Sequence, residues 1–162
     1  MSEVAPLKES EPAPARSLRI ALLGYRSNPF SGGQGIYIRY VARALRDAGH
    51  QVDVISGAPY PELDDNIRLI KLPGLNLFET ERPGRALRWR HLTSATDTFE
   101  WLSKMSGGFP EPYTFGRRVV NFFRHNASNY DVIHDNKSLS YGVLALQKIG
   151  LNVVSTIHHP IT

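Results

Sequence analysis

Residues 19–56 alternate between apolar runs of strand length and an amphipathic helix, and this alternation constrains the fold more than any other feature. The runs RIALLG (19–24) and QVDVIS (51–56) are short and rich in branched side chains, as buried strands of a parallel sheet are. Between them, apolar positions recur at helical spacing until Gly49: Tyr37, Val41, Ala44, Leu45 and Ala48. Strand, helix and strand in this order form the βαβ unit of a parallel sheet.

The same alternation continues along the rest of the chain. Further strands are predicted at 67–72, 130–134 and 151–158, and helices at 36–48, 85–105, 114–128 and 138–149. Strands that alternate with helices imply an α/β fold with a Rossmann-like, doubly wound parallel sheet, covered on both faces. The expected strand order is 3-2-1-4-5, with the carboxyl ends of all strands at one edge, where ligands bind in such folds.

The length and composition fit one globular domain. Of 162 residues, 41% are hydrophobic and 21% are charged, which is enough for a sizeable core. The segment 1–17 combines Pro, Ala, Ser and Glu without an apolar block, so we expect a disordered tail there and a folded domain over 18–162. No run has the length of a signal-peptide core or a transmembrane helix. The absence of cysteine excludes disulfides and thiolate metal sites and fits a reducing compartment, and we expect a cytoplasmic protein.

A glycine-rich loop precedes the first helix and contains Gly32, Gly33 and Gly35. A loop of this kind gathers unpaired backbone N–H groups and the positive end of the helix dipole at one point. Such a point suits a phosphate, so a ligand-binding enzyme is the leading hypothesis. A plain tight turn remains the alternative for this short motif.

Two common phosphate-binding motifs fit the loop poorly. A P-loop ends in Gly-Lys-Ser/Thr, whereas Gly35 is followed by Ile36. A dinucleotide fingerprint has its glycines directly after the first strand and an acid at the end of the second. Here Gly32 lies eight positions after Gly24, and Ser56 ends the second strand. A nicotinamide-dependent dehydrogenase is therefore disfavoured.

Two histidines fall at or near the carboxyl ends of predicted strands, His134 on the fourth and His158 on the fifth. A histidine at this edge can donate a hydrogen bond or transfer a proton near neutral pH, and His158 is the stronger candidate. His159 points to the opposite side of the strand, and no third ligand has suitable spacing for a metal site. The remaining histidines are interpreted as structural or surface residues: His50, His91 and His125.

The segment 74–118 is less regular and strongly basic in part. Four arginines surround Trp89: Arg82, Arg85, Arg88 and Arg90. An insertion of this kind above the sheet is a candidate to line the binding site of a substrate that accepts a transferred group, or to contact a membrane. The net charge of +4 permits attraction to anionic groups. A solvated basic helix face is an equal alternative.

Four segments occur in a familiar order: RIALLGY, SGGQGIYIRYVARALRDAGHQVDVIS, YDVIHDN and VVSTIHHP. Together they resemble the N-terminal, acceptor-side domain of family-4 retaining glycosyltransferases. The resemblance covers about 18–162 and is weakest in the arginine-rich middle. It implies one half of a GT-B fold, in which two Rossmann-like domains face each other.

The resemblance also implies roles for particular residues. It assigns Gly32, Gly33 and Gly35 to the loop that faces the donor diphosphate and the acceptor, and it makes His158 the catalytic histidine beside the transferred sugar. Three residues around the end of the fourth strand become candidate acceptor-binding residues: His134, Asp135 and Asn136. No metal or other cofactor is implied, because the nucleotide-sugar is a substrate and helix dipoles and basic groups can neutralise the leaving diphosphate.

The activity implied is hexosyl transfer from a nucleotide-sugar donor to a hydroxyl acceptor, with retention. The sequence ends four residues after His158 and lacks the Glu-x7-Glu motif of the family's donor domain, so we expect a half that is inactive alone. Its expected partners are the donor, a carbohydrate or lipid-linked acceptor, the C-terminal donor domain or a second copy joined at an exposed fifth strand, and the inner face of a membrane. No nucleic acid partner is expected. The alternative function is a non-catalytic module that binds an acceptor or a partner.

Overall fold

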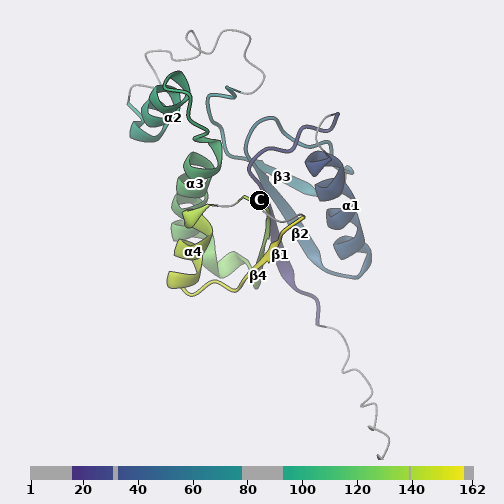
Figure 1. The fold of residues 1–162 in the computed structure, drawn as a ribbon. Coiled ribbons are helices and arrows are strands. Elements are labelled where there is room, and N and C mark those ends of the chain that lie inside the picture. The colour runs from purple at the N-terminus through teal and green to yellow at the C-terminus, as the bar shows by residue number, and fades with distance from the viewer. Residues whose placement is uncertain (1–15, 31–32, 78–92, 139, 159–162) are drawn as a thin grey trace, which may run out of the picture.

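The computed structural model describes residues 16–30, 33–77, 93–138 and 140–158. Within these residues five parallel strands form one sheet: β1 (Arg19–Gly24), β2 (Gln51–Ser56), β3 (Arg68–Lys71), β4 (Val132–Asn136) and β5 (Val153–Thr156). Their order is β3-β2-β1-β4-β5, as Figure 1 shows for most of them. The predicted Rossmann-like fold and strand order are confirmed.

Helices cover both faces of this sheet. α1 (Gln34–Asp47) lies on one face, and α3 (Glu111–Asn126) and α4 (Tyr141–Lys148) lie on the other (Figure 1). α2 (Ala95–Met105) packs beside α3, and a short 3-10 turn, Ala127–Asn129, follows α3. None of the described helices is long and apolar enough to cross a membrane.

The core has two layers because strand side chains alternate between the faces. Leu22 of β1 packs toward α1 with Ile38, whereas its neighbour Leu23 packs toward α3 with Phe115 and Phe123. All of these side chains are essentially buried. The central strand β1 is therefore held from both sides, as its continuous apolar sequence predicts.

An arginine cluster fixes α1 to the connection between β2 and β3. Asp64 in that connection accepts hydrogen bonds from Arg43 and Arg39 of α1, at 2.6 and 3.3 Å. The hydrogen bonds from Arg43 hold the pKa of Asp64 well below its ordinary value. Asp64 thus supplies ion pairs that position the first helix.

The fourth strand lies two residues later than predicted, over 132–136 instead of 130–134. Tyr130 still belongs to the preceding turn, where its N–H donates to the Ala127 carbonyl. The strand instead extends through Asp135 and Asn136, whose polar side chains suggested a loop. They belong to it because their backbones pair with Leu23 of β1 and Thr156 of β5.

Several sequence predictions fall outside the described residues. They include nearly all of the tail predicted over 1–17, the arginine-rich stretch 82–90, His91, His159 and Gly32. The helix predicted over 85–105 is described from Ala95, where the Ser94 hydroxyl accepts a hydrogen bond from the Asp97 N–H and caps the helix.

Candidate functional site

The first half of the candidate site is the loop that connects β1 to α1. Gly33 stands directly before the helix with φ of 70°, a left-handed conformation that glycine adopts without strain. A Cβ at Gly35 would overlap the carbonyl oxygens of Ser27 and Asn28. The close approach of these backbones requires glycine at position 35.

The N-terminus of α1 is open to an anion. Among the described residues no side chain caps it, and its first turn contains no acidic residue. The first intrahelical hydrogen bond runs from Tyr37 N–H to the Gly33 carbonyl, so the N–H groups of residues 34–36 have no acceptor within the helix. Together with the helix dipole they favour a negatively charged ligand.

The second half is His158, two residues after the end of β5. Its Nε2 lies 2.6 Å from Oδ1 of Asn136, and its ring meets that of Tyr37 edge to face, with centroids 4.4 Å apart. Tyr37 belongs to the first turn of α1. His158 therefore lies at the same edge of the sheet as Gly33 and Gly35, and their roles stay predictions.

Asn136 orients the histidine ring. It is the last residue of β4 and is 1% exposed. An amide oxygen only accepts, so Nε2 of His158 is the donor, which leaves Nδ1 as the nitrogen available to a ligand. The Asn136 Nδ2 atom is buried and has no hydrogen-bond partner among the described residues.

His134 has a different position from the one predicted. The later end of β4 places it in the middle of the strand instead of at the edge, and its Nε2 lies 2.7 Å from Oγ1 of Thr156. Burial lowers the pKa of His134, and the nearby Asp135 carboxylate opposes that shift. This histidine is a half-buried link between β4 and β5.

Asp135 faces the other side of the sheet, because strand neighbours alternate. It is 3% exposed, and its carboxylate accepts a hydrogen bond from the Ser138 N–H at 3.3 Å. Burial raises the pKa of Asp135, and the bonds to Ser138 oppose this shift. It lines a cavity of about 330 Å³ beside Leu144 and Ile157. The three candidate acceptor residues thus divide between two faces, with His134 and Asn136 on the α1 side.

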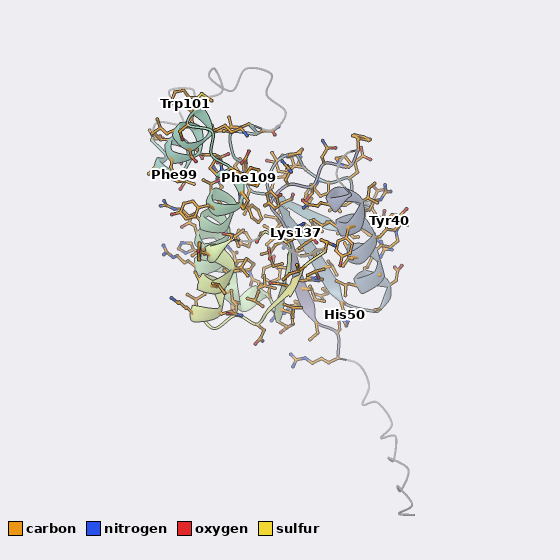
Figure 2. All side chains as sticks on the ribbon, viewed as in Figure 1. Tyr40, His50, Phe99, Trp101, Phe109 and Lys137 are labelled. Carbon is orange, nitrogen blue, oxygen red and sulfur yellow. The ribbon has the colours of Figure 1, made fainter. Side chains whose placement is uncertain are left out.

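Two residues at this edge were not singled out by the sequence analysis. Tyr37 was interpreted only as an apolar helix position, although it follows Gly35 by two residues. Arg26 lies after β1, with its guanidinium 5.6 Å from the Tyr25 ring and 5.8 Å from the Phe109 ring. Figure 2 shows Phe109 at this end of the sheet and His50 at the opposite end. No local pattern marks Arg26, since Phe109 is distant in sequence.

Within the described ranges, no three His, Cys, Asp or Glu side chains lie together as metal ligands would.

Comparisons with known proteins identify the family. The model of Glycosyltransferase Family 4 matches residues 31–162. An MMP alpha-(1->4)-mannosyltransferase of Mycolicibacterium hassiacum is 44% identical over 146 residues, which are 90% of this chain and 36% of the relative. A crystal structure of LpCGTa in complex with UDP has a TM-score of 0.48 at 16% identity, over 86% of this chain and 30% of that one. From the family match and the identity to the mannosyltransferase, the chain belongs to glycosyltransferase family 4.

Proposed function

We propose that this chain supplies the acceptor-side half of a retaining glycosyltransferase that moves mannose from a nucleotide-sugar to a hydroxyl acceptor. One observation carries the proposal: the uncapped N-terminus of α1 and His158 lie side by side at the carboxyl edge of the sheet. The Tyr37 ring, in the first turn of α1, contacts the His158 ring. The family membership supports sugar transfer, and the identity to an alpha-(1->4)-mannosyltransferase supports mannose as the sugar.

In this proposal the loop residues Gly33 and Gly35 and the first turn of α1 face the donor diphosphate. Negative charge develops on the diphosphate as the bond to the sugar breaks. Preorganised N–H groups and a helix dipole stabilise that charge without reorganisation, which lowers the barrier. The absence of a side chain at Gly33 leaves the backbone accessible to the phosphate oxygens.

His158 acts on the transferred sugar or on the acceptor hydroxyl. Its Nε2–H is bound to Asn136, so the ring presents Nδ1 in a fixed orientation, either as an acceptor or, when protonated, as a donor. Asn136 is a positioning residue, because it acts through the histidine. The edge-to-face contact with Tyr37 fixes the ring from the other side.

The nucleotide contacts come, in this proposal, from a second domain. The chain spans 36% of the length of the curated relative that it matches. Half of a cleft neither orients the donor nor excludes water, so we expect the isolated chain to be inactive.

A chimera tests the function directly. Residues 1–162 are joined to the part of the mannosyltransferase relative that follows its matched region, and transfer from nucleotide-activated mannose is measured with the relative's acceptor. We expect transfer by the chimera, none by residues 1–162 alone, and transfer about 10²–10³ slower by a chimera carrying His158→Ala at the same enzyme concentration. A folded chimera that binds the acceptor without transferring sugar would instead support the non-catalytic binding module.

A further inference from the structure

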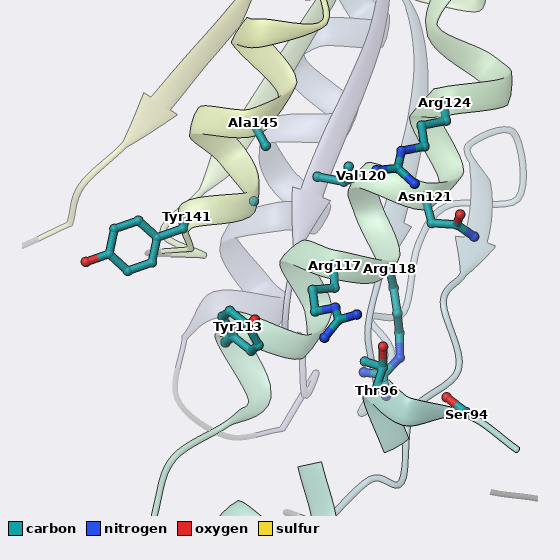
Figure 3. Close-up of a pocket in the computed structure, with 11 residues that line it drawn as sticks. Ser94, Thr96, Tyr113, Arg117, Arg118, Val120, Asn121, Arg124, Tyr141 and Ala145 are labelled. Atoms are coloured by element: carbon teal, nitrogen blue, oxygen red, sulfur yellow. The ribbon is translucent and has the colours of Figure 1, made fainter. Parts of the chain in front are cut away.

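A groove of about 550 Å³ lies between α3, α4 and the start of α2 (Figure 3). Its lining includes three arginines of α3, at positions 117, 118 and 124, and two tyrosines, Tyr113 and Tyr141. No acidic side chain is among the described residues that line it. The groove is on the helical layer that covers the face of the sheet opposite α1, so it is separate from His158.

The three arginines differ in their partners. Arg118 binds Asp97 at 2.6 Å and also pairs with Glu100, so its charge is balanced within the fold. Arg117 and Arg124 are exposed, and neither forms an ion pair or hydrogen bond with another residue that the structure describes. Their cationic groups remain available to a ligand.

The spacing of Arg117 and Arg124 along α3 is the basis for the ligand length that we infer. Seven positions correspond to two turns of α3, or about 10 Å along the helix axis, so both side chains emerge on the same face. Asn121 lies between them and also lines the groove. Each guanidinium presents a planar fork that fits a carboxylate, sulfate or phosphate group.

The two tyrosines at the α4 end indicate the rest of the ligand. Both tyrosines line the groove, and Tyr113 is 43% and Tyr141 80% exposed. Tyr113 contacts the Phe99 ring edge to face, and Figure 3 shows the Tyr141 ring at the rim, pointing outward from the helices. Exposed aromatic rings offer flat apolar surfaces with a polar hydroxyl, which suit the faces and hydroxyls of sugar rings. A concave groove of this volume holds a small molecule, whereas a membrane requires an outward-facing surface.

We propose that this groove binds an elongated anionic saccharide whose negatively charged groups lie about 10 Å apart, one on Arg117 and one on Arg124. Sugar rings between or beside these groups contact Tyr113 and Tyr141. The inference does not require sugar transfer, because a groove on the helical layer can bind a saccharide whether or not His158 is catalytic.

Calorimetric titration of the purified chain tests the proposal, with a sulfated tetrasaccharide as the probe and the unsulfated tetrasaccharide as its control. We expect binding of the sulfated probe alone, weakened by added salt because the charges are exposed. Arg117→Ala and Arg124→Ala should each weaken binding about tenfold, since each removes one charge-assisted contact. Tyr141→Ala should weaken it by a smaller factor.

Lys148→Ala is the matched control, because Lys148 is an exposed cation of α4 outside the groove. It should change affinity less than twofold, and circular dichroism verifies that every variant is folded. Equal effects of all three charge-removing variants would overturn the proposal, as would failure of the sulfated probe to bind. Arginine-dependent binding to phosphatidylserine vesicles without saccharide binding would replace it with a membrane contact. The chimera can transfer mannose under any of these outcomes, so the two proposals fail independently.

Discussion

The two strands that lead into the candidate active site differ in how firmly they are held. Ala21, Leu22 and Leu23 of β1 have no exposed surface, whereas Val154 of β5 is 56% exposed. β1 pairs with a strand on each side and packs against a helix layer on each face. In the described part of the chain, β5 pairs with β4 alone.

This difference means that the two halves of the site have different support. The glycine loop follows the most buried strand, and its geometry is set by backbone packing around Gly35. His158 follows an edge strand, and its ring is held by two side-chain contacts, to Asn136 and Tyr37. The described end of the loop, Gly33 to Gly35, is thus preorganised by the core, while the histidine depends on its immediate neighbours.

The largest expected effect is on the free energy of unfolding, which should depend much more on a buried side chain of β1 than on an exposed one of β5. Leu22→Ala should lower the free energy of unfolding by about 3–5 kcal/mol, because it leaves a cavity at a fully buried position. Val154→Ala should cost less than about 0.5 kcal/mol, since its side chain is mostly solvated. Urea unfolding measures both, and similar costs would mean that β5 is buried in solution by a contact that this structure does not contain.

The next effect concerns the histidine half of the site. In the active chimera, His158→Ala should lower turnover by about 10²–10³, or roughly 2.7–4 kcal/mol, with little change in donor affinity. Gly33→Val should also weaken donor binding, because a branched side chain is strained at φ of 70° and blocks the approach to the backbone. Steady-state kinetics and a separate nucleotide titration distinguish the two. Turnover of His158→Ala within about threefold of wild type would remove its catalytic role.

A smaller effect tests whether Asn136 supports the histidine. Asn136→Ala should lower turnover about tenfold, because one hydrogen bond to the ring is lost and Nε2–H is no longer held. The double variant with His158→Ala should be no worse than His158→Ala alone, since a positioning residue acts through the group that it positions. Additive losses would show that Asn136 contacts the substrate independently.

The exposed edge of β5 predicts weak self-association of the isolated chain. An unpaired strand edge with apolar side chains, here Val154 and Ile157 at 56% and 63% exposed, favours pairing between copies. Sedimentation should detect a concentration-dependent increase in mass that Val154→Lys reduces. A monomer at all concentrations would show that the twist and polar residues of β5 suffice to prevent pairing.

The smallest expected effect is a pH dependence of stability that arises from His134. Burial lowers the pKa of His134 in the folded state below its ordinary value of 6.5, so the unfolded chain binds the proton more readily. Its contribution to stability is therefore present above about pH 6.5 and is lost as the pH falls below that value. Thermal unfolding from pH 7.5 to 5.5 should show a smaller loss in His134→Gln than in wild type. Parallel curves would contradict the shift.

Much of the fold follows from local sequence patterns. The bounds of β1 and β2 agree with the apolar runs at 19–24 and 51–56. The fourth strand was predicted two residues too early, because side-chain polarity is a poor guide to strand ends in a sheet that is covered on both faces. Asp135 and Asn136 are buried in the strand, although their polar side chains suggest a loop. Single-sequence patterns report burial of apolar groups and do not report backbone pairing with distant strands.

The candidate site was predicted as a set of residues but not as an arrangement. The placement of the glycine loop and His158 at one edge of the sheet follows from the rule that the carboxyl ends of parallel strands lie together. The alternation of strand side chains separates Asp135 from Asn136. The contacts of His134 with Thr156 and of His158 with Tyr37 depend on strand register and helix placement. Neither register nor placement is encoded within one local window.

The sequence by itself determined the alternation of strands and helices, the glycine at the close backbone approach, and the membership in glycosyltransferase family 4. Tertiary structure alone decided which face each polar side chain of β4 presents, which histidine is an internal link, and which arginines of α3 remain unpaired. The physical reason is the separation along the sequence over which each interaction acts. Propensity and periodicity act over a few residues, whereas hydrogen bonds, ion pairs and burial join side chains that only the folded chain brings together.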